Sequence, residues 1–215
     1  MSETGRDEGV IKFELVHSYK NLAVNSQFVL LNDCRNFLHA QGLIGEYPDG
    51  IGFGNVSILA DDRKSFLITG TQTGAKPALG QFDYTNVTQV DFTSHTVYSE
   101  GPLLPSSEAV THAMIYRCSK ATSVIHIHSA RLWQKYLNLA GREYEIAIVP
   151  ESVPYGTVQM AENVAALLSD LQVYQGGIIV MAGHEDGILF FGDSIDEARN
   201  RLQYWRSVYF RTRDR

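Results

Sequence analysis

The chain has 215 residues, of which 44% are hydrophobic and 20% are charged, and its formal net charge is −6. This size and hydrophobic content are typical of one compact α/β domain, and the acidic balance argues against non-specific nucleic-acid binding, which requires a basic face. No apolar run approaches the about 20 residues that cross a bilayer.

The first nine residues are polar and acidic, unlike a signal peptide, and the two cysteines are typical of reduced thiols in a cytoplasmic protein. We therefore expect a cytoplasmic protein without membrane partners. Residues 1–9 are predicted to form a disordered tail, and residues 10–215 are predicted to form a single domain.

The first half of the chain is predicted to contain one helix, then a pair of strands, and then one or two further strands. Apolar residues recur at helical period before Gly42 and Gly45, and later segments alternate or are rich in β-branched residues. The predicted ranges are 26–43 for the helix and 56–60, 65–69, 86–92 and 95–99 for the strands.

The second half is predicted to alternate helices and strands and to close with a hairpin and a helix. The predicted helices are 106–119, 130–140, 157–171 and 194–212, and the predicted strands are 122–128, 144–149, 177–182 and 188–191. Ser194 and Glu197 have the spacing of a capping box at the last helix start. Strands both in adjacent pairs and between helices indicate an α/β fold with a mixed, mainly antiparallel sheet.

Two histidines alternate with two isoleucines in Ile125-His126-Ile127-His128, at the end of a predicted strand. Residues two apart in a strand point to the same side, so His126 and His128 would present two imidazoles together. Two neutral imidazoles at this spacing form half of a zinc-type metal site. A half-buried strand with two hydrogen-bonded histidines is the alternative interpretation.

A third candidate ligand is His184, in a turn between two apolar strands. Turns at a sheet end often hold functional side chains, although an ordinary surface-turn histidine fits the same pattern. Three histidines would leave an open coordination position, as in catalytic zinc sites. His112 lies one helical turn after Glu108 and is predicted to pack near the site instead of binding metal.

The segment Pro105-Ser106-Ser107-Glu108 is typical of a helix start. Free backbone N–H groups, two hydroxyls and the positive end of the helix dipole could bind a phosphate or carboxylate. Simple helix capping is the alternative. Two glycine-bearing turns, residues 52–55 and 69–74, would allow a ligand to approach the backbone closely, and ordinary turns are the alternative for both.

Taken in order, these motifs resemble the class II aldolase/adducin family over residues 28–209. The resemblance is carried by Gly54-Asn55-Val56-Ser57, Ile68-Thr69-Gly70-Thr71, Pro105-Ser106-Ser107-Glu108, His126-Ile127-His128 and Gly183-His184. The chain length is similar to that of the small bacterial sugar-phosphate aldolases of this family.

The resemblance implies a three-layer α/β/α sandwich and a homotetramer. It implies Zn²⁺, or another divalent cation such as Mn²⁺ or Co²⁺, on His126, His128 and His184, with Glu108 as the acid/base and a possible further ligand. The positions implied to bind a substrate phosphate are Asn55, Thr71, Ser106 and Ser107.

The implied activity is that of a lyase which cleaves or forms aldols of a small sugar phosphate, or a related anionic hydroxy-carbonyl compound, through a metal-stabilised enediolate. A metal-dependent epimerase or dehydratase of the same family is the alternative. An adducin-like binding module without catalysis is a third possibility.

The sequence departs from the family pattern in three places. Glu185 and Asp186 separate His184 from Gly187, where family members have a glycine directly after the histidine. Ser152 stands where fuculose-phosphate aldolases carry a proton-donating tyrosine, so that Tyr155, Tyr204 or Tyr209 would have to replace it. Residues 10–23 are extra, and we predict that they add an edge strand.

Overall fold

The computed structural model describes residues 9–139, 145–170 and 176–211. Except for Gly9, the predicted disordered tail lies outside this range. So do residues 140, 144, 171 and 212, each of which is a predicted end of a helix or strand. Nine described strands belong to one sheet: β1 (Glu14–Tyr19), β4 (Asn55–Leu59), β5 (Phe66–Thr69), β6 (Tyr84–Asp91), β7 (Thr96–Gly101), β8 (Ser123–His128), β9 (Ile146–Val149), β10 (Gly177–Met181) and β11 (Gly187–Gly192).

The described sheet has the strand order β1-β7-β6-β5-β4-β8-β11-β10-β9. Only its two outermost pairs, β1 with β7 and β9 with β10, are parallel, while the neighbours between them are antiparallel. The prediction of a mixed, mainly antiparallel sheet is therefore confirmed. The predicted extra edge strand is β1, which pairs with β7 from Glu14 opposite Thr96 to Tyr19 opposite Gly101.

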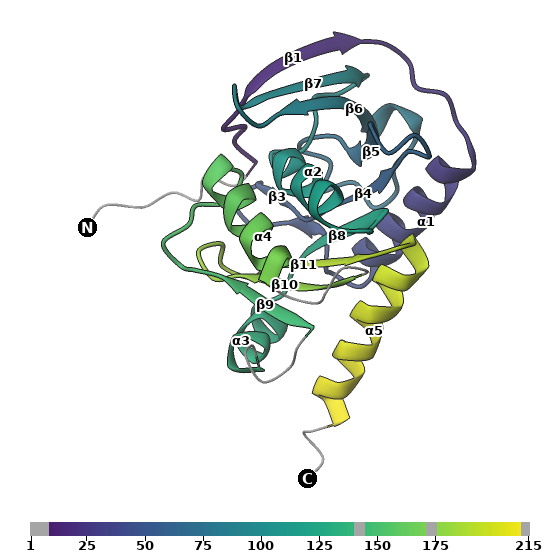
Figure 1. The fold of residues 1–215 in the computed structure, drawn as a ribbon. Coiled ribbons are helices and arrows are strands. Elements are labelled where there is room, and N and C mark those ends of the chain that lie inside the picture. Colours follow the sequence, from purple (N-terminus) through teal and green to yellow (C-terminus); the bar gives the residue numbers. More distant parts are fainter. Residues whose placement is uncertain (1–8, 140–144, 171–175, 212–215) are drawn as a thin grey trace.

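Five described helices cover the two faces of this sheet (Figure 1). They are α1 (Ser26–Ala40), α2 (Ala109–Cys118), α3 (Ala130–Leu139), α4 (Val158–Asp170) and α5 (Ile195–Arg211). Apolar residues of α2 and α4 belong to one buried cluster, and those of α1, α3 and α5 belong to a second cluster on the opposite face. The three-layer α/β/α sandwich is thus confirmed.

The central strand β8 shows how strand alternation separates the two faces. Val124 belongs to the α2 and α4 cluster, whereas Ile125 and Ile127 belong to the cluster of α1, α3 and α5. Because neighbouring side chains in a strand point to opposite sides, His126 and His128 lie on the same side as Val124. The two histidines therefore lie on one face, as the sequence predicts, with the isoleucines buried behind them.

The predicted helix 106–119 begins later than expected. Pro105 forms an isolated bridge with Gly70, which holds the chain against a neighbouring loop just before the helix. Glu108 is the N-cap residue, with φ −88° and ψ 6°, and helical residues begin at Ala109. This small difference places Glu108 before the first turn of α2 and not within it.

A short hairpin and a 3₁₀ turn complete the described elements. The hairpin pairs β2 (Gly45–Glu46) with β3 (Gly52–Phe53), and the 3₁₀ turn spans Gln81–Asp83. The hairpin contributes Tyr47, which lies in the connection between its strands and contacts His128.

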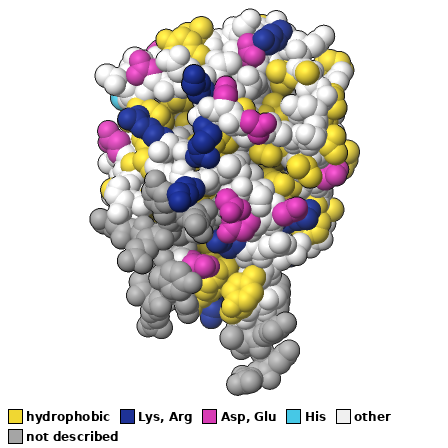
Figure 2. Space-filling model, turned by 45° about the vertical axis from the view of Figure 1, so that its right-hand side comes forward, with side chains coloured by type: hydrophobic (Ala, Val, Ile, Leu, Met, Phe, Trp, Pro, Cys, Tyr) yellow, Lys and Arg dark blue, Asp and Glu magenta, His cyan; other side chains and the backbone are white. Residues whose placement is uncertain are grey.

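The described surface has mixed charge. On the face shown in Figure 2, basic and acidic side chains are interspersed among apolar ones, without the broad basic area that nucleic-acid binding requires. Among the helices that the structure describes, none combines the length and apolar character that a membrane crossing needs. Cys34 on α1 and Cys118 on α2 are free thiols.

Candidate active site

The three predicted histidines lie together at one end of the sheet. His126 and His128 come from β8, and His184 comes from the turn that joins β10 to β11, the antiparallel neighbour of β8. One ring nitrogen of each histidine lies within 4.8 Å of the other two. All three side chains are buried, at 1%, 4% and 4% relative exposure.

The spacing of the ring nitrogens is close to that of a metal centre. His184 Nε2 lies 2.9 Å from His128 Nε2. Two nitrogens bound at about 2.0 Å to a tetrahedral ion would be about 3.3 Å apart. Small rotations of the rings would therefore suffice to direct three lone pairs at one ion.

The turn that carries His184 accommodates the inserted Glu185-Asp186 pair without moving the histidine away. Asp186 adopts φ +70°, and the Gly187 amide donates to the His184 carbonyl at 2.9 Å. A methyl group at Gly187 would be 2.1 Å from His184 Cδ2, so a side chain there would displace the ring. Neither inserted carboxylate joins the cluster of donor atoms, which among the described residues consists of the three histidines.

The other ring nitrogens of the β8 histidines contact polar neighbours. The Tyr47 hydroxyl lies 2.7 Å from His128 Nδ1, and the Asn55 side-chain nitrogen Nδ2 lies 3.2 Å from His126 Nδ1. An oxygen that accepts from Nδ1–H keeps the proton on Nδ1 and leaves the Nε2 lone pair for a metal. A tyrosine hydroxyl can accept in this way. Asn55 could do the same if its side-chain amide were turned over, which would bring Oδ1, an atom without a hydrogen-bond partner in the described structure, to His126 Nδ1.

Burial keeps His126 neutral. Desolvation, reinforced by the neighbouring histidines, holds its pKa well below the usual value of 6.5. Its Nε2 has no hydrogen-bond partner in the described part of the chain. A neutral, buried imidazole with an unused nitrogen is the form that binds a divalent cation, and the residues present therefore fit such an ion.

A single pocket brings the histidine cluster together with the predicted anion-binding residues. It is lined by His126, His184, Glu108 and Tyr155, by Asn55, Thr71, Ser106 and Ser107, and by Gly9 and the glycine-bearing turns 52–54 and 70–74. All four residues predicted to bind phosphate therefore face the same space as His126 and His184. The two glycine-bearing turns, for which ordinary turns were the alternative, also line the pocket through Gly52, Gly54 and residues 70–74.

Glu108 is buried at the point where the pocket meets α2. Its side chain is 2% exposed, and a methyl group at Gly156 would lie 3.7 Å from its Oε1. Its backbone amide donates to Ser106 Oγ at 3.4 Å. The carboxylate oxygens are not part of the histidine donor cluster. The carboxyl group lies in the same pocket as His126 and His184, and its burial shields it from water.

Three tyrosines are candidate proton donors. Within the described residues, only Tyr155 lines the pocket. Its ring centre lies 4.1 Å from that of His184, and the Lys12 ammonium lies 3.9 Å above the ring. Tyr204 is 61% exposed on α5, and the side chain of Tyr209 lies outside the described residues. Ser152 is exposed.

His112 packs beneath the site, as predicted. Its Nδ1 lies 2.7 Å from Ser57 Oγ, and the same hydroxyl contacts Tyr116 Oη at 2.5 Å. Complete burial lowers the pKa of His112 to about 3. His112 is therefore a neutral core histidine.

Sequence reasoning missed two side chains near the pocket. Tyr47, which contacts His128, has no distinctive pattern around it. Arg35 does have one, because it is a charged residue on the buried face of α1, together with Leu31, Cys34 and Leu38. A charge at the i+4 position of an apolar stripe is unusual and could have marked it.

The fold and site together define a three-layer α/β protein with a buried trihistidine cluster that opens into a polar pocket. Residues 49–208 match the family model of the Class II Aldolase and Adducin N-terminal domain. The chain belongs to this family. A search of curated proteins gave no match.

Solved structures of similar fold include YgbL from Klebsiella pneumoniae, named as a candidate aldolase, epimerase or decarboxylase. It has 19% identity and a TM-score of 0.65, with 87% of this chain and 89% of that chain covered. An L-fuculose 1-phosphate aldolase has 20% identity and a TM-score of 0.59, with 90% and 89% covered. The L-fuculose-1-phosphate aldolase of Thermus thermophilus has 20% identity and a TM-score of 0.57, with 85% and 91% covered. At these identities the likeness establishes the fold.

Proposed function

We propose that this chain is a metal-dependent lyase that cleaves or forms an aldol of a small sugar phosphate or a related anionic hydroxy-carbonyl compound. The observation that carries this proposal is that two of the three clustered histidines, His126 and His184, share one pocket with Glu108 and the serine pair that precedes α2. Each part supplies something that aldol chemistry needs and that the others lack.

In this proposal His126, His128 and His184 hold a divalent cation. Three imidazoles favour Zn²⁺, and Mn²⁺ or Co²⁺ could occupy the same nitrogen donors. When bound, the cation supplies a Lewis acid that polarises the hydroxyl and carbonyl oxygens of a substrate.

Glu108 is the proposed acid/base. A buried carboxyl group beside the reacting carbons can take up a proton from substrate and return it, and positioned proton transfer contributes about 10²- to 10⁴-fold to a rate. Tyr155 is the proposed second proton donor, since its ring lies against His184 and lines the pocket.

The anionic end of the substrate is proposed to bind Asn55, Thr71, Ser106 and Ser107. Both serines are nearly buried, at 7% and 6% exposure, and immediately precede α2, whose dipole favours negative charge at its N-terminal end. Fixing this end would orient the reacting carbons toward Glu108 and the histidines. We also propose the homotetramer implied by the family, which light scattering would test as four times the chain mass.

The decisive experiment combines metal analysis with a substrate panel. Purified protein, stripped and reloaded with Zn²⁺, Mn²⁺ or Co²⁺, would be incubated with ketose and aldose phosphates while released aldehyde and ketone products are measured. We expect about one ion per chain and retro-aldol products that require the ion. Protein that binds no ion stoichiometrically and releases no product would contradict the proposal and favour a binding module.

Epimerisation or dehydration remains the second candidate because Ser152 occupies the place of the aldolase tyrosine and is exposed. Both reactions use the same cation and the same proton carrier but release no product of carbon–carbon cleavage. Exchange of substrate hydrogen with deuterated water without aldehyde release would favour this alternative.

A further inference from the structure

The segment of residues 9–13 reaches the pocket from a part of the chain that precedes β1 and lies outside residues 49–208, which match the family model. Gly9 lines the pocket, and a methyl group there would be 2.8 Å from Gln72 Nε2. Four residues later, Phe13 is buried in the apolar cluster of α2 and α4. The segment therefore runs from the pocket to the core, and the pairing of β1 with β7 holds the chain that follows it.

Within this segment, Lys12 makes two contacts with one residue, Tyr155. Its ammonium donates to the Tyr155 carbonyl oxygen at 3.2 Å and lies 3.9 Å from the centre of the Tyr155 ring. Lys12 is half-buried, and the attraction between an ammonium and an aromatic face is stronger where water is partly excluded. Since one contact holds the backbone and the other holds the ring, together they restrict rotation of the Tyr155 side chain.

The Tyr155 ring also contacts His184, with the ring centres 4.1 Å apart and the ring planes inclined at 65°. The turns that carry the two residues pack closely against each other. A methyl group at Gly183 would be 2.5 Å from the carbonyl oxygen of Glu151 and 2.7 Å from that of Val153. The backbone thus brings Tyr155 to the histidine cluster, and the contact with Lys12 fixes the orientation of its ring.

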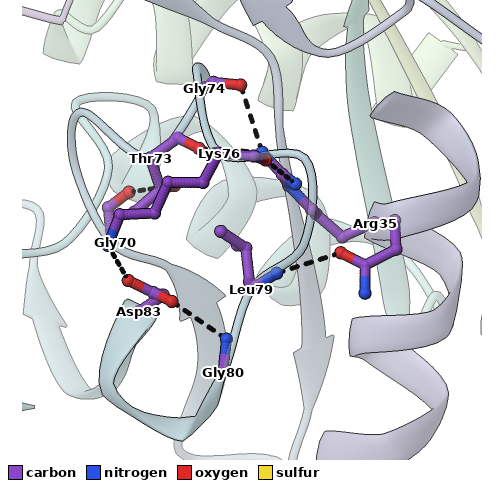
Figure 3. Close-up of polar contacts among 9 residues, drawn as sticks. Arg35, Gly70, Thr73, Gly74, Lys76, Leu79, Gly80 and Asp83 are labelled. Carbon is purple, nitrogen blue, oxygen red and sulfur yellow. Dashed lines mark hydrogen bonds and ion pairs between the residues drawn. The ribbon is translucent and has the colours of Figure 1, made fainter. Parts of the chain in front are cut away.

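A second wall of the pocket, residues 70–74, is also held by a cation from an earlier part of the chain. Arg35 of α1 donates to the carbonyl oxygens of Thr73, Gly74 and Lys76 (Figure 3). Arg35 holds backbone in this way, whereas Lys12 also covers a ring. Lys12 therefore acts on a side chain whose hydroxyl can transfer a proton.

We propose that Lys12 is a positioning residue that fixes the Tyr155 ring against His184, so that a segment outside the matched family region determines the geometry of the proton donor. Lys12 does not contact the substrate in this proposal and acts through Tyr155. The inference rests on the proposed function only for the use of the Tyr155 hydroxyl in proton transfer, because the position of the ring is measured without turnover.

Ring position is tested by NMR of the full chain labelled with ¹³C in its tyrosine rings. The Tyr155 resonance is the one missing from Tyr155→Phe, and the adjacent His184 ring should displace it from the position of an exposed tyrosine. Lys12→Met, which removes the charge and the donor, should move this resonance. Lys12→Arg, which keeps both, should move it less. Lys20→Met is the matched control, because it removes an exposed lysine that pairs with Glu100 at the end of β1, and it should leave the resonance unmoved.

Kinetics test whether the ring position matters for proton transfer. Lys12→Met should lower kcat at least about tenfold and change KM less than about twofold, because misplacing a reacting group slows the chemical step without removing a substrate contact. The loss should disappear when Lys12→Met is combined with Tyr155→Phe, since no hydroxyl is then left to position. Lys12→Arg should recover most of the rate, and Lys20→Met should match the wild type.

An unmoved Tyr155 resonance in Lys12→Met, or an equal movement in Lys20→Met, would overturn the inference, as would an equal fall in kcat with and without the Tyr155 hydroxyl. If Lys12→Met does not fold, the unmodified protein decides the question through a nuclear Overhauser contact between the Lys12 side chain and the Tyr155 ring, whose absence would overturn the inference. Normal wild-type turnover with an unmoved resonance would leave the proposed function intact. A moved resonance in a protein without turnover would contradict the proposed function and support the role of Lys12.

Discussion

The two sides of the pocket are built in different ways. On one side, His126 and His128 are held by the alternation of a central strand, and their place follows from sequence spacing alone. On the other side, the loop of residues 70–76 is held in part by hydrogen bonds from Arg35, on a helix of the opposite layer. The strand side is encoded locally, whereas the loop side depends on tertiary contacts.

This difference predicts how each side responds to substitution. A substitution on the strand side should abolish metal binding and leave the fold intact. A substitution of Arg35 should instead lower the stability of the loop of residues 70–76, because it removes the donor of three of its carbonyls.

The largest expected effect is that of His126→Ala. Loss of the proposed metal would remove several kcal/mol of charge stabilisation, which corresponds to about 10³-fold or more in turnover. Metal content and kcat would be measured, with His39→Ala, a partly exposed residue of α1, as the control. Equal metal content in the two variants would contradict the ligand assignment.

Glu108→Gln should separate proton transfer from metal binding. We expect kcat to fall by about 10²- to 10³-fold while metal content stays unchanged, because Glu108 is outside the donor cluster. Glu185→Gln, at an exposed position in the inserted turn, should have little effect. Metal loss in the Glu108 variant would instead make this carboxylate a ligand.

Tyr155→Phe tests the replacement for the missing tyrosine. Removing one hydroxyl from the pocket should lower kcat by about 10²-fold if that hydroxyl donates the proton. Tyr204→Phe removes a hydroxyl from an exposed residue and should leave kcat unchanged. A normal rate in Tyr155→Phe would exclude this role.

His112 predicts how acid affects stability. Its pKa is about 3 when folded, against 6.5 as the ordinary value, so between these pH values the unfolded chain binds the extra proton. The free energy of unfolding should therefore fall with acidification, by about 1.4 kcal/mol per pH unit below pH 6.5.

Urea unfolding of metal-free protein at pH 6.5 and 4.5 would measure this fall in wild type and in His112→Asn. The wild type should lose more stability than the variant over this interval. Identical losses would show that His112 does not supply the difference.

The smallest expected effect is that of Tyr47→Phe. The hydroxyl contacts His128 Nδ1 at 2.7 Å, and removing such an outer partner weakens metal affinity by about tenfold. Tyr98→Phe, on β7 and distant from β8 in the sheet order, is the control for competition titrations against a metal indicator. Unchanged affinity in Tyr47→Phe would mean that β8 alone orients His128.

Most of the fold could be predicted because its signals are local. Apolar periodicity and turn residues give the type and order of the elements, and the alternation in β8 correctly places Ile125 and Ile127 behind the histidines. The start of α2 was placed too early, because the bridge between Pro105 and Gly70 is a contact between segments distant in sequence.

The site could be predicted to the extent that motifs carry it. His184 joins the cluster despite the two inserted residues because Gly187 leaves room for its ring, which spacing alone could not show. Tyr47 and Arg35 escaped prediction, since each acts through a contact made by the folded chain. Arg35 nevertheless left a visible sign, a charge within the apolar stripe of α1.

The contact between Arg35 and the loop of residues 70–76 also has a consequence for folding. The loop follows α1 in the chain, so during synthesis the helix emerges first, but its guanidinium finds the three carbonyls only after the loop folds back over it. Contacts between such separated segments form late, once chain entropy has been lost. The wall that residues 70–74 give to the pocket is therefore completed only when the tertiary fold brings this loop to Arg35.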